Sequence, residues 1–128
     1  MAEATATRLV VVISGRCPNW ANRRGSHWGP TYRAKEARKQ LVWGMTRLAM
    51  GRRPRASGPC SATATLRICG TLRDWDNAVA SLKVDCDALR LAGAIFQDTP
   101  AMLRLTVRQE ACPHRVDEAV VWEVTADG

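Results

Sequence analysis

The sequence has few of the residues that form the most recognisable metal and redox sites. Its 128 residues include two histidines, and its five cysteines contain no Cys-x-x-Cys spacing. His27 and His114 lie far apart and form no His-x-x-x-His or Cys/His group. The pattern therefore predicts neither a zinc ribbon nor a thioredoxin-like site, and the cysteines are expected to be free thiols.

Long hydrophobic runs are also lacking. The longest wholly apolar stretch is Leu9–Ile13, whereas a helix needs about 20 such residues to cross a bilayer. The first residues, MAEATATR, have no apolar run behind a positive region, so we predict no secretion signal. We therefore expect a cytoplasmic protein that makes no membrane contact.

Acidic residues are scarce in the first half of the chain. Residues 1–56 contain twelve Arg or Lys and two acids, a net charge of +10, whereas the remainder contains seven and ten, a net charge of −3. Arginine predominates, and its forked guanidinium suits phosphate. A basic half beside an acidic half predicts a polyanion bound by one and a cation bound by the other. We favour nucleic acid as the polyanion over a merely solvated surface.

Hydrophobic periodicity predicts the secondary structure. Short β-branched or alternating stretches predict strands, and apolar residues at helical spacing predict helices. The expected strands cover residues 8–14, 60–72, 102–109 and 118–125, and the expected helices cover 31–50 and 77–91. The order β-α-β-α-β-β predicts an α+β fold with a mixed sheet and two helices. We expect a single domain over residues 1–128, with residues 1–7 flexible.

An Asp-x-Asp pair stands where the second expected strand meets the second expected helix. Positions two apart in an extended chain face the same side, so the carboxylates of Asp74 and Asp76 are expected to converge. Two adjacent like charges are unfavourable without a cation between them, and Mg²⁺ or Mn²⁺ prefers such oxygen ligands. Asp98, in the loop after the helix, is a candidate third ligand, whereas Trp75 is expected to pack inward.

A purely structural explanation of the same residues stays open. Asp76 is a natural helix N-cap, and Asp74 can pair with Arg73. Lys83 lies seven residues after Asp76, about two helical turns, and therefore on the same helix face. A single lysine at such a position is more often solvated than catalytic.

The segment between the first strand and the first helix is a basic loop. Residues 15–30 read GRCPNWANRRGSHWGP and are rich in turn-forming residues. Trp20 and Trp28 can pack in the core or stack on exposed bases, and the arginines of residues 16–24 and 52–55 can bind phosphates. The loop is therefore a candidate nucleic-acid contact.

Taken together, several of these residues resemble the RusA-type Holliday junction resolvases of bacteria and their phages. The similar positions are RDWDN at 73–77, Lys83, Asp87-Ala88-Leu89, Gly93 and Asp98, with Cys17-Pro18-Asn19 in the first loop. The similarity runs over residues 8–125. In the best-known form of the family the lysine follows the second aspartate by four residues rather than seven. The family also often has two acids where this chain has Gln97-Asp98.

The resemblance implies a homodimeric endodeoxyribonuclease of a bacterial cell, encoded by the cell or by a phage or prophage. Such an enzyme binds four-way DNA junctions and uses Mg²⁺, or Mn²⁺, to make paired symmetric nicks in recombination and repair. The resemblance assigns metal binding to Asp74, Asp76 and Asp98, and catalysis to these residues and Lys83. The DNA contacts that we expect with it are Arg16, Asn19, Arg23, Arg24, His27 and Arg73.

Two other functions stay open at this point. One is a DNA-binding protein of phage or prophage origin that has the same fold and no catalytic activity. The other is a nuclease that cuts branched DNA in general rather than four-way junctions.

Overall fold

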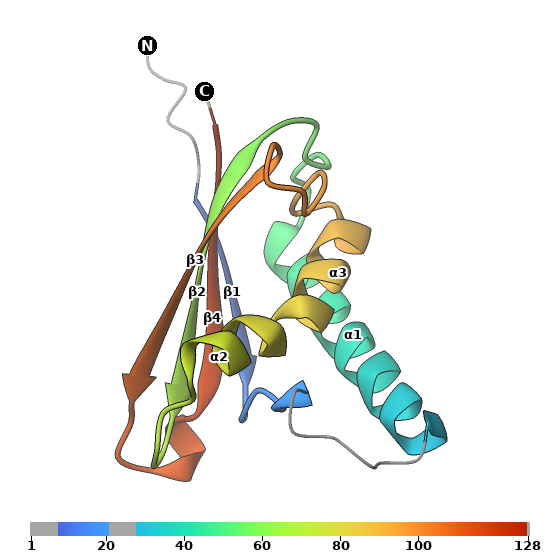
Figure 1. Ribbon diagram of the computed structural model, residues 1–128. Helices are drawn as coiled ribbons and strands as arrows, with labels where there is room; N and C mark the ends of the chain where they lie inside the picture. Colours follow the sequence, from blue (N-terminus) through green and yellow to red (C-terminus); the bar gives the residue numbers. More distant parts are fainter. Residues whose placement is uncertain (1–7, 21–27, 128) are drawn as a thin grey trace.

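The computed structural model describes residues 8–20 and 28–127, which form a four-stranded mixed sheet with the helices packed on one face (Figure 1). The strands are β1 (Leu9–Ser14), β2 (Cys60–Ile68), β3 (Leu103–Ala111) and β4 (Ala119–Ala126). The helices are α1 (Trp28–Met50), α2 (Trp75–Ser81), α3 (Lys83–Ala92) and the short 3₁₀ helix η2 (Arg115–Asp117). The predicted α+β fold with a mixed sheet is confirmed, and the expectation for residues 1–7 lies outside the described residues.

The strand order places the last strand in the middle of the sheet. The order is β1-β4-β2-β3, with β4 antiparallel to both β1 and β2, and with β2 parallel to β3. A parallel pair requires a crossover connection, and α2 and α3 provide it. Ser14 pairs with Ala119, which pairs with Arg67, which pairs with Glu110. The carboxyl ends of β1, β2 and β3 therefore lie at the same edge of the sheet.

The core lies between the sheet and the helices. Val11, Leu66 and Trp122 face this side of the sheet and are buried, as are Val42 of α1 and Leu89 of α3. Alternate strand residues point to opposite faces, so a sheet covered on one side has one buried row per strand. All five cysteines are free, as the sequence predicts. Within residues 8–20 and 28–127, no helix combines the length and apolar character needed to cross a membrane.

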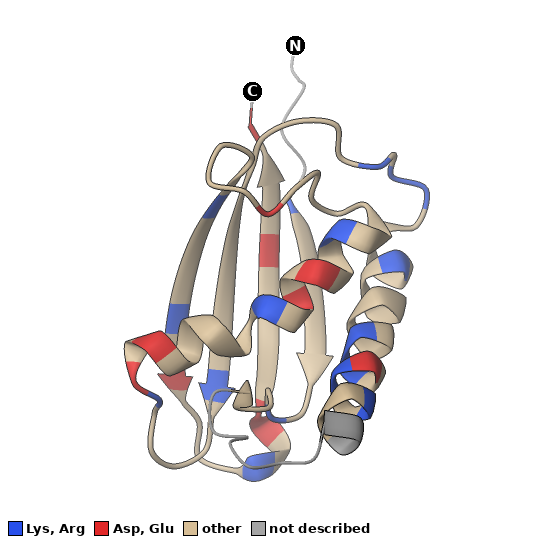
Figure 2. Cartoon of the chain, turned by 45° about the vertical axis from the view of Figure 1, so that its right-hand side comes forward, with Lys and Arg blue, Asp and Glu red and all other residues tan. Residues whose placement is uncertain are grey.

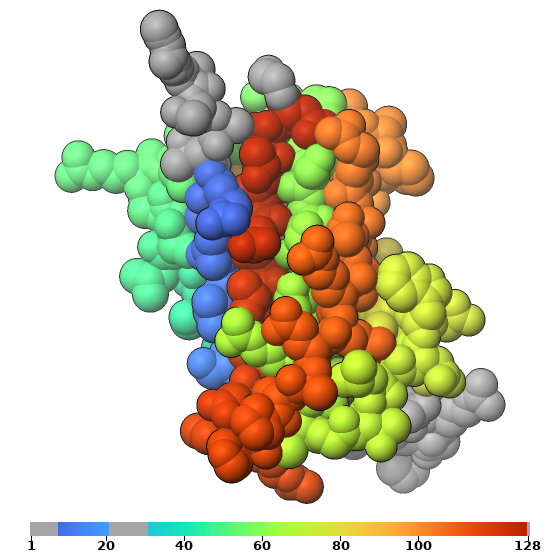
Figure 3. Space-filling model, turned by 90° about the vertical axis from the view of Figure 1, so that its left-hand side faces the viewer, coloured from blue at the N-terminus to red at the C-terminus, as the bar shows by residue number. Residues whose placement is uncertain are grey.

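No helix of the described residues, 8–20 and 28–127, covers the other face of the sheet. Figure 3 looks onto this face, where β1, β4, β2 and β3 lie side by side. Val10 and Val12 of β1 are partly exposed there, and the neighbouring rows carry Thr63, Thr65 and Thr106. The open face therefore carries β-branched side chains together with charged ones such as Arg67 and Glu110.

The junction between β2 and the second helical region differs from the prediction. β2 ends at Ile68 rather than at residue 72, and Gly70 turns the chain away with a φ of 105°. A φ in this range favours glycine because it has no Cβ. The predicted helix 77–91 is two helices, and Asp74 rather than Asp76 is the N-cap.

The break between α2 and α3 falls at a single residue. Leu82 has φ −93° and ψ −2°, and its N–H bonds to Val79 O at 3.1 Å, an i→i−3 bond that tightens the turn. Trp75, expected to pack inward, is 62% exposed at the start of α2. The expectation assumed an extended chain at this point, whereas Trp75 is the first helical residue and points into solvent.

Candidate functional site

A cleft of about 440 Å³ lies at the sheet edge where β1 and β2 end. One wall is the loop that follows β1, and the other is the segment that leads from β2 into α2. We call this hollow the Asp74 cleft. It is lined by Arg16, Cys17, Pro18, Asn19, Ile68, Thr71, Leu72, Arg73, Asp74 and Asn77. The structure therefore brings three of the predicted DNA contacts, Arg16, Asn19 and Arg73, to the same hollow as one predicted metal ligand.

The two aspartates of the Asp-x-Asp pair stand on either side of a helix start. Asp74 has extended backbone angles, φ −57° and ψ 151°, and its carboxylate makes no capping bond, whereas Asp76 lies in the first turn of α2. The extended chain on which the expected convergence rested is therefore absent, because the helix begins between the two aspartates. Both side chains are exposed, and neither forms an ion pair within the described residues. Both carboxylates are therefore accessible to a ligand.

The other two predicted catalytic residues lie next to each other. Lys83 Nζ is 3.9 Å from Asp98 Oδ2, with Lys83 at the start of α3 and Asp98 in the loop that follows it. The Lys83 side chain is 75% exposed and that of Asp98 is 30% exposed. Across residues 8–20 and 28–127, no three side chains of His, Cys, Asp or Glu gather as metal ligands. Asp98 is thus paired with Lys83 rather than grouped with Asp74 and Asp76.

A hard divalent cation fits part of the predicted ligand set. Mg²⁺ commonly takes only one or two carboxylates and completes its shell with waters and substrate phosphates. Asp74 and Asp76 offer exposed carboxylates that form no ion pair with another described residue. Asp98 already has Lys83 as its counter-ion. The chemistry of the site therefore suits a magnesium ion held mainly by Asp74 or Asp76 and by phosphate.

Arg16 ties one wall of the cleft to the rest of the sheet edge. Its Nε and Nη2 contact Glu118 Oε2 at 2.8 and 2.5 Å, and Nη2 also donates to Cys69 O at 2.7 Å. Glu118 Oε2 accepts the Cys69 N–H as well, at 2.9 Å. Arg16, and then the Cys69 amide, hold the pKa of Glu118 below its usual value. The Arg16 side chain is nevertheless 49% exposed, so it can still meet a phosphate.

Arg73 has a different environment from the one that the sequence suggests. Its guanidinium donates to Cys17 O and, at 2.8 Å, to Ser81 Oγ, and the side chain is half-buried. It therefore joins the loop after β1 to the end of α2, and both terminal nitrogens of its guanidinium bond to groups of the chain. Asn19 is also half-buried in the cleft wall. Three further predicted DNA contacts, Arg23, Arg24 and His27, lie outside the described residues.

Several arginines of the basic half cap carbonyl groups near the opposite edge of the sheet. Arg47 donates to Ala92 O at 3.0 Å, and Arg55 donates to Leu91 O at 3.0 Å. Arg53 donates to Arg8 O at 3.1 Å. The last carbonyls of a helix lack partners within that helix, so the first two bonds satisfy the end of α3. Part of the +10 charge of the first half therefore serves the fold.

The first half of α1 carries basic side chains that remain on the surface. Arg33 and Lys35 are exposed, and Lys35 Nζ lies 5.8 Å from the centre of the Trp20 ring. Figure 1 shows α1 starting at the end of the molecule where β1 and β2 finish. Figure 2 shows Lys and Arg along α1 and acidic positions at the start of α2. Positive charge thus lies at the same end as the Asp74 cleft.

A buried ion pair lies beneath the helices and has no counterpart in the sequence predictions. Arg38 Nε and Nη2 donate to Asp85 Oδ1 and Oδ2 at 2.8 and 2.9 Å, and Trp122 Nε1 donates to Asp85 Oδ2 at 3.3 Å. The side chains of Arg38 and Asp85 are 6% and 0% exposed. One signal was present, because Arg38 falls four residues before Val42 on the buried face of α1. Its partner, 47 residues away, is not visible from periodicity.

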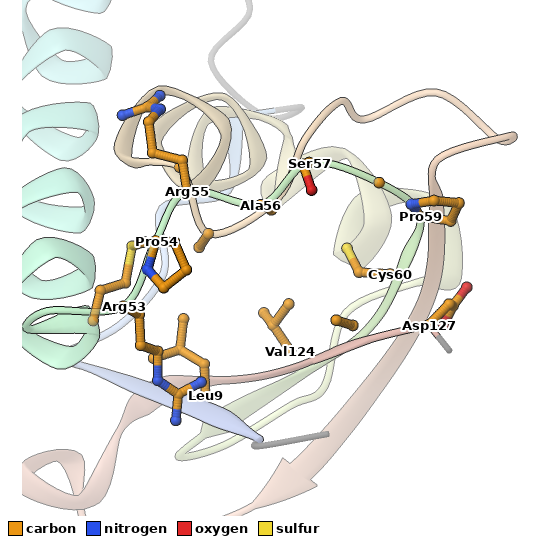
Figure 4. A pocket seen from close by; sticks show the side chains of 15 residues that line it. Leu9, Arg53, Pro54, Arg55, Ala56, Ser57, Pro59, Cys60, Val124 and Asp127 are labelled. Carbon is orange, nitrogen blue, oxygen red and sulfur yellow. The ribbon is translucent and has the colours of Figure 1, made fainter. Parts of the chain in front are cut away.

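A second hollow, of about 540 Å³, lies at the other edge of the sheet. Figure 4 shows it under the turn between α1 and β2, with Cys60 and Val124 directed into it and Arg55 turned away. Arg53 and Arg55, two of its charged lining residues, are bonded to main-chain carbonyls. Its interior is mainly apolar, and it shares no residue with the Asp74 cleft.

Comparisons with known proteins were made at the level of family models and of individual curated proteins. No family model and no curated protein matches this chain.

Proposed function

We propose that the protein is a Mg²⁺-dependent endodeoxyribonuclease that acts on branched DNA, with the four-way junction as its substrate. The observation that carries the proposal is the Asp74 cleft, where Asp74, whose carboxylate makes no capping bond, lines the same hollow as Arg16 and Asn19 at the carboxyl ends of two strands. The exposed arginine and lysine side chains in the first half of α1 would add contacts to phosphates.

The reaction is hydrolysis of a phosphodiester bond. A bound magnesium ion would polarise the scissile phosphate and lower the pKa of the attacking water. Asp74 and Asp76 would supply carboxylate ligands. Arg16 and Asn19 would hold a phosphate group against the cleft wall, since Arg16 keeps half of its surface exposed. The chain therefore provides positioning and charge, which such a reaction chiefly requires.

Lys83 would act through its flexible, exposed side chain. Its contact with Asp98, at 3.9 Å and 75% exposure of the lysine, is a surface pair of the kind worth about 1 kcal/mol or less. An incoming phosphate can therefore compete with Asp98 for the ammonium group. In the proposed reaction Lys83 would then stabilise the negative charge that develops on the phosphate.

A twofold dimer would suit a four-way junction. Resolving a four-way junction into two duplexes requires two nicks at symmetric positions, and a twofold axis brings two identical sites to two strands. The dimer is part of the proposal and rests on the resemblance to the resolvases. Size-exclusion chromatography with light scattering would measure it directly.

The decisive experiment compares variants and substrates in one nicking assay. Asp74→Asn and Asp76→Asn should each lower Mg²⁺-dependent nicking of a labelled four-way junction by roughly 100-fold or more, because several kcal/mol of transition-state stabilisation are lost. Junction binding should persist. Asp117→Asn is the matched control, since Asp117 is also exposed and has no ion pair in the described part of the chain.

The outcome also separates a junction resolvase from a general nuclease. Linear duplex, flap and fork substrates should be nicked far more slowly than the junction, and no substrate should be nicked without Mg²⁺. Equal rates on flap, fork and junction would contradict the preference for four-way DNA. Normal nicking by both aspartate variants would contradict the assignment of the cleft.

A DNA-binding protein without catalytic activity is the second candidate. Two observations favour it: Lys83 is paired with Asp98, and the chain between Asp74 and Asp76 is the start of a helix rather than an extended segment. This function predicts that affinity for DNA falls steeply as salt rises, while no DNA structure is nicked in Mg²⁺.

A further inference from the structure

A glutamine occupies an inward-facing position at the end of β3. Leu105 and Val107 face the helices and pack on the core, and Gln109 is the next residue of the same row. A polar side chain in such a row is costly unless its donors and acceptors are satisfied. Gln109 is therefore expected to have specific partners.

Both ends of its amide bind the main chain of a single residue. Gln109 Oε1 accepts the Arg73 N–H at 2.8 Å, and Gln109 Nε2 donates to Arg73 O at 2.8 Å. β2 has ended five residues earlier, at Ile68, so Arg73 has left the strand ladder. The amide of Gln109 thus pairs with the Arg73 peptide groups as a neighbouring strand would.

This pairing holds Arg73, a lining residue that contacts both walls of the cleft. The Arg73 side chain reaches Cys17 O in one wall and Ser81 Oγ at the end of α2. Asp74 follows directly in the chain and lines the cleft as the N-cap of α2. A shift of the Arg73 main chain would therefore move Asp74 relative to the opposite wall.

We infer that Gln109 is a positioning residue, which holds the Arg73 backbone and thereby sets Asp74 against Arg16 and Asn19. The inference rests on the proposed nuclease function for its catalytic consequence. Gln109 touches neither DNA nor metal in this role. Its removal should lower the rate of nicking and leave DNA affinity unchanged.

The test uses two variants of Gln109 and one control. Gln109→Met keeps the length of the side chain and removes both hydrogen bonds, whereas Gln109→Glu keeps an acceptor for the Arg73 N–H. Since a misplacement of about 1 Å in an active site can cost about 100-fold, Gln109→Met should lower the nicking rate about 10- to 100-fold at saturating junction. Gln109→Glu should keep more of the rate. The control is Thr106→Val, on the outward face of the same strand.

Affinity for the junction, measured without Mg²⁺ by fluorescence anisotropy, should stay within about twofold of wild type for Gln109→Met and Thr106→Val, with an unchanged salt slope. An equal loss of affinity and rate in Gln109→Met would refute positioning and indicate a general defect in the fold. A wild-type rate in that variant would refute it as well.

A measurement without catalysis separates this inference from the proposed function. Hydrogen exchange at the Arg73 amide should accelerate at least tenfold in Gln109→Met, because its acceptor is lost. Unchanged exchange would refute the clamp, by which we mean the two hydrogen bonds of the Gln109 amide to the Arg73 main chain, whatever the activity. If wild-type protein nicks no substrate, the proposed function fails, and faster exchange in the variant would still support the clamp.

Discussion

Replacing Asp85 by alanine should destabilise the protein by about 3–5 kcal/mol, because the change leaves the Arg38 guanidinium buried without its counter-ion. The Arg38 side chain is 6% exposed, so water cannot replace the two hydrogen bonds at 2.8 and 2.9 Å. Trp122 Nε1 also loses an acceptor, and its longer bond of 3.3 Å adds at most about 1 kcal/mol.

The size of this effect is easily measurable. Domains are typically stable by about 5–15 kcal/mol, so the loss is a large fraction of the total. At about 3–5 °C per kcal/mol for a chain of this size, the melting temperature should fall by about 10–25 °C. Urea unfolding followed by far-ultraviolet circular dichroism gives the free energy without relying on Trp122.

Two further variants make the prediction specific to the ion pair. Asp87→Ala is the matched control, since Asp87 lies on the same helix, is half-buried and has no ion pair in the described part of the chain. It should cost less than about 1 kcal/mol. Combining Arg38→Met with Asp85→Leu should recover most of the stability, because buried pairs can be replaced by apolar residues at little cost.

The reasoning would be refuted by either of two results. A loss below about 1 kcal/mol in Asp85→Ala would mean that the guanidinium reaches water or another acceptor. A double variant as unstable as the single one would mean that the loss comes from packing. If Asp85→Ala does not fold, Asp85→Asn tests the same charge at nearly constant volume.

Three other stability and reactivity predictions follow from single positions. Gly93→Ala should lower the free energy of unfolding by about 1–3 kcal/mol, since φ is 92° and a Cβ would lie 2.9 Å from Arg55 Cγ. Gly44→Ala, whose Cβ would have nothing within 4 Å, should instead stabilise α1 by about 0.5–1 kcal/mol. Equal midpoints of urea unfolding for the two variants would contradict this contrast. Burial raises the pKa of Cys17 to about 11 and that of Cys86 to about 12. In timed thiol labelling at pH 8, the half-buried Cys69 should therefore react far faster than either, and equal labelling rates would be inconsistent with the burial of Cys17 and Cys86. The pKa of Glu118 is lowered in the folded state, so the ionised carboxylate stabilises the fold above its unfolded pKa, and this effect is lost as the pH falls through the folded pKa. Glu118→Gln should therefore be less stable than wild type at pH 7 and equally stable in strong acid. A difference in stability that does not change with pH would argue against the Arg16 contact as the source of the effect.

The local structure was largely predictable from the sequence because periodicity is a local property. The β-branched residues near Val11 and the alternation near Leu66 predict strands that the structure contains, with boundaries that differ by a few residues at most. The region around Leu82 was not predicted, because a single tight turn does not interrupt the apolar spacing of a helix. Asp76 was misplaced for another reason, since the helix starts two residues earlier than expected.

The candidate site was predictable in part. Asp74, a predicted metal ligand, and Asn19, a predicted DNA contact, line the same cleft. Gln109 was not found from the sequence, because it looks like an ordinary polar residue in an alternating strand. Its importance comes from two bonds to Arg73, which is 36 residues away.

The sequence by itself determined the α+β class, the alternation of β2 and β3 and the excess of positive charge in residues 1–56, since each depends on composition or on spacing along the chain. Only the tertiary structure decided that β4 lies between β1 and β2, that Arg38 meets Asp85, and that Arg73 is held inside the chain. These outcomes depend on which groups meet across long separations. A guanidinium looks alike in sequence whether it will bind phosphate, a carbonyl or a buried carboxylate, and folding selects among these partners.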